Sequence, residues 1–229
     1  NFAMNRLAIN DLTGGIYPMK FKHFELIING EIYNYSELKA LLLANRVPLK
    51  TTCDAEVILP LFDLYGTKAF NLLEGMFSLA IVDKKEKRLL LVRDKFGEKP
   101  LYYLQDNQKT IFFASELKVL LATNTYNRLN QTALYNYFRH GSVFGKDTLV
   151  KNIYKLTPGK MLEFSLSNKT ISTHKYFQLK PNQDLPQNTT ALISYFDQHL
   201  QRSGKRRMLS DVTIGTFLSG GIYSSPITS

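Results

Sequence analysis

Three parts of the chain carry side chains that together could bind a small charged molecule. Arg6 offers a guanidinium, Asn29-Gly30-Glu31 offers an amide, a bare backbone and a carboxylate, and Asp54 adds a second carboxylate. A guanidinium can grip a carboxylate through two hydrogen bonds, and two carboxylates can hold an ammonium group. An amide beside a backbone N–H can stabilise a developing oxyanion. These groups match a free α-amino acid with a reactive carbonyl in its side chain.

Each of these residues also has a simpler interpretation. Asn29-Gly30 is first of all a turn signal, so a strand, a turn and a helix start are expected there. Arg6 could be a surface charge, Glu31 a solvated turn residue, and Asp54 a charge at a helix N-terminus. Their separation along the sequence does not show that they meet, so both interpretations stay open.

A second candidate site follows the apolar run at 213–218. Ser219-Gly220-Gly221 and a serine-rich helix start would expose backbone N–H groups to an anion, phosphate or pyrophosphate being favoured. The stretch is not the Walker pattern, which has a lysine after its second glycine. A glycine-rich turn with a serine N-cap explains the same residues equally well.

Apolar periodicity predicts the elements that would position these groups. Ser115 and Asn130 are expected to cap two of the helices, and Pro60 is expected to kink another or to interrupt a hydrogen bond in it. The predicted helices span 36–44, 54–66, 68–73, 116–121, 131–138 and 191–202; the predicted strands lie within 6–11, 24–28, 76–83, 88–93, 101–104, 110–114, 156–164, 169–172 and 213–218. Antiparallel sheets covered by helices are therefore expected up to about residue 178, and a parallel α/β unit after about 190.

The composition excludes several classes of protein. The chain has 229 residues, of which 44% are hydrophobic, without an apolar run that could cross a bilayer and without a signal-peptide pattern. One Cys and four scattered His give no metal-ligand spacing and no internal disulfide. The formal charge of +10 is spread along the chain, which argues against a nucleic-acid groove. We therefore expect no metal held by His or Cys, no nucleic acid and no membrane.

The motifs along almost the whole chain resemble, in order, those of the glutamine-dependent asparagine synthetase family. The matching stretches are 6–12 with 14–15 and 18–19, 29–34, 53–59, 73–77, 93–103, 112–118, and 206–212 leading into 218–221. The resemblance implies an α+β fold, a four-layer α/β/β/α sandwich of the N-terminal-nucleophile hydrolase type. The first strand of an α/β pyrophosphatase-type domain follows it. The implied domains are a class II glutamine amidotransferase (glutaminase) domain over 1–178, a linker over 179–190 and the start of an ATP-binding synthetase domain over 191–229.

The same resemblance implies an activity, ligands and residue roles. Glutamine would be hydrolysed and its ammonia used for the ATP-dependent amidation of aspartate to asparagine. ATP and magnesium would serve as cofactors, in a cytoplasmic enzyme that forms a homodimer. Arg6 would bind the α-carboxylate of glutamine, Asn29 and Gly30 would form the oxyanion hole, and Glu31 and Asp54 would hold the α-amino group. The wall of this site would be Leu7, Ala8, Ile9 and Asn10, and the ATP contacts would be Leu218, Ser219, Gly220, Gly221 and Ser224.

Two residues depart from the family pattern. The family nucleophile is an N-terminal cysteine whose own amine acts as general base, whereas this chain begins at Asn1. Cys53 has no free amine and is expected to be a small packed residue. Tyr223 stands where the family has an aspartate at the magnesium-nucleotide end of its site. We therefore expect the chain as given to be a fragment that catalyses neither half-reaction. The alternatives are a non-catalytic glutamine-binding remnant and a related amidotransferase with another acceptor.

Overall fold

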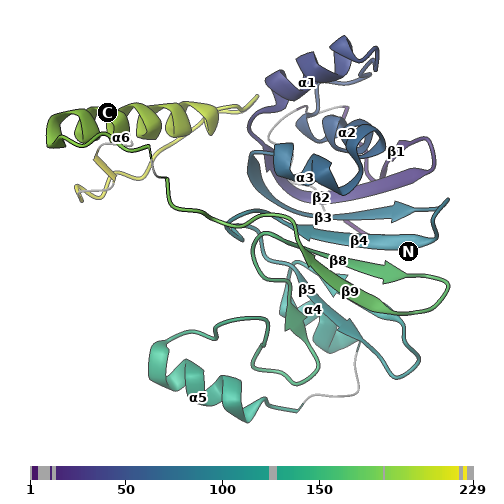
Figure 1. Ribbon diagram of the computed structural model, residues 1–229. Coiled ribbons are helices and arrows are strands. Elements are labelled where there is room, and N and C mark those ends of the chain that lie inside the picture. Colours follow the sequence, from purple (N-terminus) through teal and green to yellow (C-terminus); the bar gives the residue numbers. More distant parts are fainter. Residues whose placement is uncertain are drawn as a thin grey trace.

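The computed structural model describes residues 2–4, 11, 14–123, 128–182, 184–221 and 224–225 (Figure 1). Its larger sheet has six strands in the order β1-β2-β3-β4-β8-β9, and its smaller sheet has three in the order β6-β5-β7. Neighbouring strands in both sheets are antiparallel. The strands are β1 Met19–Phe21, β2 Phe24–Ile32, β3 Gly75–Asp83, β4 Arg88–Arg93, β5 Tyr102–Gln105, β6 Ile111–Ala114, β7 Tyr154–Lys155, β8 Lys160–Ser165 and β9 Ile171–Lys175.

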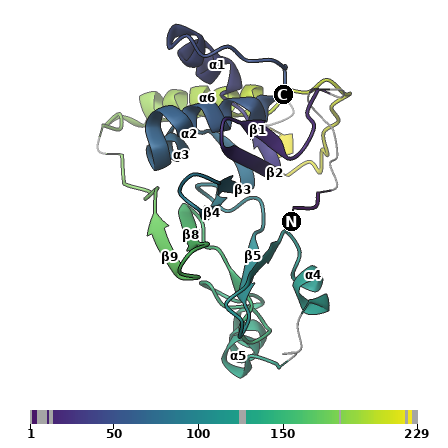
Figure 2. The ribbon, with the colours of Figure 1, turned by 90° about the vertical axis from the view of Figure 1, so that its right-hand side faces the viewer.

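The helices fall into two groups on opposite sides of the sheets (Figures 1 and 2). The first group lies against the large sheet, and the second follows the small sheet. A third region, α6, comes after the sheets and stands beside the first group. The helices are α1 Tyr35–Ala44, η1 Asp54–Val57, α2 Ile58–Tyr65, η2 Gly66–Lys68, α3 Ala69–Leu72, α4 Leu117–Ala122, α5 Gln131–His140 and α6 Thr189–Arg206.

Alternation along the strands separates the core into three clusters. On β3, Leu79 and Ile81 pack with the first group of helices, whereas Ala80 and Val82 belong to a cluster between the two sheets. A third cluster, which contains Leu120, joins the small sheet to α4. The layers therefore run helix, sheet, sheet, helix, which confirms the predicted four-layer α+β arrangement.

The turn predicted at Asn29-Gly30 is not formed. β2 continues to Ile32 and stays paired with β3, with Gly30 opposite Phe77. A Cβ atom added at Gly30 would lie 2.0 Å from the carbonyl oxygen of Met76, so the glycine allows a close approach of two backbones. The turn prediction was wrong because a glycine required for close packing of two strands cannot be told from a turn glycine in the local sequence.

Two further local predictions were wrong. Ser115 does not cap α4, whose N-cap is Glu116 and has no side-chain cap bond. Pro60 does not kink a helix, because the predicted helix is divided into η1 and α2 and Pro60 falls in the first turn of α2. A backbone N–H has no partner within the helix at that place, so proline is tolerated there. The N-cap at Asn130 is confirmed, since its side chain accepts a hydrogen bond from the Ala133 N–H.

After the sheets, the described residues form α6 and, following it, a mainly irregular segment. Asn188 caps α6 by accepting a hydrogen bond from the Ala191 N–H. The strand predicted at 213–218 is not formed, and these residues are exposed. A strand of a parallel sheet gains hydrogen bonds only from its neighbours, and no described strand lies beside this segment. Among the described residues, no helix is both long and apolar enough to cross a membrane.

Candidate functional site

A cavity of about 800 Å³ lies at the end of β2, where the two sheets and η1 meet. Its polar end brings Asp54 together with Asn29, Gly30 and Glu31, which lie more than twenty positions earlier in the sequence. The apolar end lies between the sheets and includes Ile27, Leu101 and Phe113. The remaining polar lining residues are Ser78, Lys99, Ser115, Glu116, Tyr17 and Thr123. The cavity can therefore hold a small molecule with a charged end beside a hydrogen-bonding wall.

The amide of Asn29 is oriented by a residue from the other sheet. Asn29 Nδ2 donates a hydrogen bond to Ser115 Oγ at 3.3 Å, across a sequence separation of 86 residues. An amide nitrogen carries two hydrogens, so the second remains available for an oxygen atom of a ligand. Ser115 was predicted to be a helix cap, and its contact with Asn29 depends on sheet packing that local sequence does not report.

The two carboxyl groups lie in a partly desolvated setting. Asp54 is 9% exposed, and its Oδ2 accepts a hydrogen bond from the Ile32 N–H at 2.6 Å. Burial raises the pKa of Asp54, although hydrogen bonds from backbone N–H groups oppose the shift. Burial also raises the pKa of Glu31, with a further rise from the charge of Asp54 and an opposing effect of Lys99. A bound cation would lower the energy of both carboxylates, so the pair is suited to an ammonium group.

A buried aspartate builds the loop that brings Lys99 to the cavity. Asp94 is 0% exposed and accepts hydrogen bonds from the backbone N–H groups of Phe96, Glu98 and Lys99, each at 3.0 Å. Arg93 then donates to three carbonyl oxygens, two of them on this loop, those of Gly97 and Lys99. These bonds fix the loop from inside. The stretch 93–103 is one of the motifs that match the family, but its residue types alone predict no role for Asp94 or Lys99.

Comparison with known proteins identifies the larger part of the chain. The family described as "Glutamine amidotransferase domain" matches residues 1–177. The chain belongs to the glutamine amidotransferase domain family. The family described as "Asparagine synthase" matches residues 195–229, which include most of α6 and the segment that follows it. The amidotransferase domain thus contains the sheets and the cavity, and the start of an asparagine synthase domain comes after them.

Similar proteins carry names that combine both parts. A Bacillus subtilis protein named "Asparagine synthetase [glutamine-hydrolyzing] 2" is 37% identical over 239 residues, covering 99% of this chain and 32% of its own length. A Methanocaldococcus jannaschii protein named "Putative asparagine synthetase [glutamine-hydrolyzing] 2" is 36% identical, covering 97% of this chain and 46% of its own length. The chain therefore spans between about a third and a half of the length of these relatives.

Solved structures align with the chain more distantly. A glutamine phosphoribosylpyrophosphate amidotransferase from B. subtilis aligns with a TM-score of 0.47 at 16% identity. The alignment covers 68% of this chain and 30% of that one. A glutamine aminotransferase class-II domain protein from Silicibacter pomeroyi aligns with a TM-score of 0.43 at 13% identity, covering 72% of both chains.

Several of the predicted site residues lie away from the cavity or outside the described residues. Arg6, Leu7, Ala8, Ile9 and Asn10 are outside the described part of the chain, as is Tyr223. Cys53 is 0% exposed, and its Sγ lies 3.8 Å from Asp54 Oδ1, which confirms the expectation of a packed residue. Within the described ranges, no three His, Cys, Asp or Glu side chains are grouped so that they could hold a metal ion.

The predicted nucleotide loop forms a short hydrogen-bonded turn in the asparagine synthase part. Gly220 has a φ of +74°, a conformation that glycine adopts without strain. Ser219 Oγ and Ser224 Oγ lie 3.0 Å apart, and the Ser225 N–H donates to the Gly221 carbonyl at 3.2 Å. Leu218 is 62% exposed. The loop thus places two hydroxyl groups beside glycine backbone, and phosphate groups bind to hydroxyl and backbone N–H groups of this kind.

Proposed function

We propose that the cavity binds L-glutamine and serves the hydrolysis of its side-chain amide. The observation that carries this proposal is the meeting of Asn29, Gly30, Glu31 and Asp54 at one end of a single cavity. A site that binds a free amino acid and hydrolyses its side-chain amide needs two features, a carboxylate pair for the ammonium group and donors for the oxyanion. The match of this region to the glutamine amidotransferase domain supports glutamine over other amino acids.

Each residue has a separate task in this proposal. Glu31 and Asp54 hold the α-ammonium group, and Arg6 holds the α-carboxylate. The second hydrogen of Asn29 Nδ2 and the Gly30 N–H face the oxygen of the side-chain amide, where negative charge develops during hydrolysis. The nucleophile is not Cys53, because that side chain is fully buried in the described structure. In the family that the motifs resemble, an N-terminal cysteine supplies the nucleophile and its amine supplies the base.

The ammonia released would be used by the asparagine synthase part to amidate aspartate. This proposal rests on the match over 195–229 and on the names of the similar proteins. The corresponding division is an amidotransferase domain over 1–178, a linker over 179–190 and a synthase part over 191–229. Leu218, Ser219, Gly220, Gly221 and Ser224 would hold ATP, which when bound supplies the activation of the acceptor. Magnesium would accompany the nucleotide phosphates.

The replacement of Asp54 by asparagine is expected to weaken glutamine binding strongly. The asparagine side chain would keep an acceptor for the Ile32 N–H but would lose the charge that faces the ammonium group. Hydrogen bonds to charged groups contribute about 1.5–3 kcal/mol, so the dissociation constant should rise roughly ten- to hundredfold. Isothermal titration calorimetry of the chain with L-glutamine measures this change.

Two controls make the calorimetric test specific. Asp63 forms a surface ion pair with Lys22 at 2.6 Å, so Asp63→Asn removes a charge of the same kind outside the cavity. This variant should bind glutamine as the unchanged chain does. 4-Carbamoylbutanoate, which lacks the α-ammonium group of L-glutamine, should bind more weakly than L-glutamine, because the two carboxylates would then face no cation. An unchanged chain that does not bind glutamine at millimolar concentration would contradict the proposal and support a decayed remnant.

As the pH is lowered, the affinity for glutamine should begin to fall at a higher pH than carboxyl groups with ordinary pKa values would predict. The pKa values of Glu31 and Asp54 both lie above their ordinary values of 4.5 and 3.8. As the pH falls, protons therefore displace the ammonium group before an exposed carboxyl would titrate. In that pH range the binding of glutamine should release protons. Calorimetry in two buffers with different ionisation enthalpies measures the number released.

The sign of the stability effect separates this loss of binding from acid unfolding. A carboxyl group whose pKa is raised in the folded state binds more protons when folded than when unfolded. Its contribution to the free energy of unfolding therefore increases as the pH falls through the folded pKa. The chain should lose affinity in this range without losing stability on account of these two groups. A pH-independent affinity down to pH 4.5, the ordinary pKa of Glu, would contradict the assigned role.

A further inference from the structure

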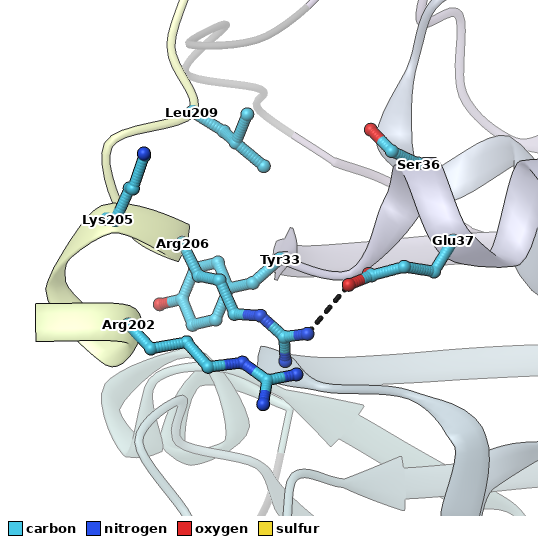
Figure 3. A pocket seen from close by; sticks show the side chains of 7 residues that line it. All are labelled: Tyr33, Ser36, Glu37, Arg202, Lys205, Arg206 and Leu209. Atoms are coloured by element: carbon cyan, nitrogen blue, oxygen red, sulfur yellow. Dashed lines mark hydrogen bonds and ion pairs between the residues drawn. The ribbon is translucent and has the colours of Figure 1, made fainter. Parts of the chain in front are cut away.

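The segment that follows α6 reaches back to the amidotransferase domain at a groove of about 350 Å³ beside α1. Figure 3 shows Arg206 extending from the end of α6 past Tyr33 to Glu37. The two groups lie 2.7 Å apart, and Arg206 also pairs with Glu74. Arg206 belongs to the region that matches the asparagine synthase family. Arg206 thus attaches the end of α6 to the amidotransferase domain.

The next residue contacts two places that border the glutamine cavity. The guanidinium of Arg207 lies over the ring of Tyr33, 4.8 Å from its centre, and Nη2 lies 3.6 Å from Glu98 Oε1. Its other terminal nitrogen donates to Ser203 Oγ at 2.6 Å, which holds the side chain against α6. Tyr33 is two residues beyond Glu31, and Glu98 immediately precedes Lys99. Arg207 therefore joins the end of β2 to the loop that Asp94 shapes.

A third contact reaches the chain next to the predicted carboxylate-binding residues. Asp211 Oδ2 accepts a hydrogen bond from the Asp11 N–H at 2.7 Å, across a sequence separation of 200 residues. Asp11 is 8% exposed and directly follows Arg6 and the predicted wall 7–10. Its own Oδ1 accepts from the Gly14 N–H at 2.7 Å. The segment 206–211 therefore contacts three stretches that carry or adjoin the predicted glutamine-binding residues.

We propose that Arg207 and Asp211 are positioning residues for the glutamine cavity. They tie the stretches bearing Glu31, Lys99 and Asp11 to the start of the synthase part. A displacement of the synthase part would then change the affinity for glutamine without any direct contact with the ligand. This inference rests on the proposed function, since it concerns the same cavity.

Calorimetry of the 229-residue chain with L-glutamine tests the inference. Arg207→Ala and Asp211→Ala should each raise the dissociation constant about two- to tenfold, as partly exposed contacts of these kinds do. Arg207→Lys keeps the positive charge, and Asp211→Asn keeps an acceptor, so both should lose less affinity. Arg202→Ala is the matched control. Arg202 lines the same groove (Figure 3), and the described residues offer it no ion pair.

Hydrogen exchange adds a measurement that does not need the ligand. In Arg207→Ala the backbone N–H groups of 96–99 should exchange faster, whereas those paired between β3 and β4 should not change. Faster exchange together with weaker glutamine binding supports the inference. Unchanged affinity in both alanine variants would overturn it even if exchange increases, because the contacts would then be structural only. If the unchanged chain does not bind glutamine, the proposed function fails and this inference falls with it, whereas a failure of the inference alone leaves glutamine binding intact.

Discussion

Replacement of Asp94 by alanine should cost the chain roughly 3–5 kcal/mol of stability, because four backbone N–H groups would lose their buried acceptor. Three of these N–H groups belong to the loop 96–99, and a fourth, that of Phe77, lies 3.3 Å from Asp94 Oδ2. Urea denaturation followed by circular dichroism measures the free energy of unfolding. Glutamine affinity should fall as well, since Lys99 would no longer be held at the cavity.

An exposed aspartate of the same type provides the control for this prediction. Asp106 accepts a hydrogen bond from the Thr110 N–H at 2.7 Å in the turn between β5 and β6, where water can replace it. Asp106→Ala should therefore cost only about 1 kcal/mol. It should also leave glutamine binding unchanged. Equal losses in the two variants would mean that the loop does not depend on Asp94.

Alanine at Gly30 is expected to destabilise the chain by about 3 kcal/mol or more, through overpacking between β2 and β3. The added Cβ would lie 2.0 Å from the Met76 carbonyl oxygen and 2.6 Å from Phe77 Cα, and both atoms belong to backbone. The φ of +147° adds strain that an L side chain does not relieve. Thermal unfolding should show a large fall in the melting temperature, and the variant should not bind glutamine.

Gly141 separates the two causes of this loss. It ends α5 with a φ of +70°, and no atom lies within 4 Å of a Cβ built there. Gly141→Ala should therefore show the backbone strain alone, about 1 kcal/mol. A loss at Gly30 that is no larger than the loss at Gly141 would show that β2 and β3 can separate to accept the methyl group.

Strand alternation is a local signal, and it predicted antiparallel sheets covered by helices, whereas the four-layer order was implied by the family resemblance. Leu79 and Ile81 alternate with Ala80 and Val82, and the two sets do face different layers. The caps and strand ends were less accurate where a residue has a non-local partner. Ser115 resembles a helix cap, and its bond to Asn29 exists only after the two sheets pack.

The candidate site shows the same limit. The residue types at Asn29, Gly30, Glu31 and Asp54 predicted an amino-acid site, and the structure brings these four residues to one cavity. What the residue types could not report is which groups hold them there. Asp94 resembles an ordinary charge after a strand, although it is fully buried. The role of Asp94 depends on the path of the loop whose N–H groups it accepts, and hydrophobic periodicity does not predict the path of a loop.

The bonds around the cavity differ greatly in the length of chain that they close. Those from the loop to Asp94 join residues 2 to 5 positions apart, whereas the bond from Asp11 to Asp211 joins residues 200 positions apart. The entropy lost on closing a loop grows with its length, so local contacts form early in folding and distant ones late. The loop bearing Lys99 can therefore form with the β3–β4 hairpin, while the contact at Asp211 must wait for nearly the whole chain. During synthesis from the N-terminus, the strands that line the cavity would pair before the segment that ties them to the synthase part has emerged.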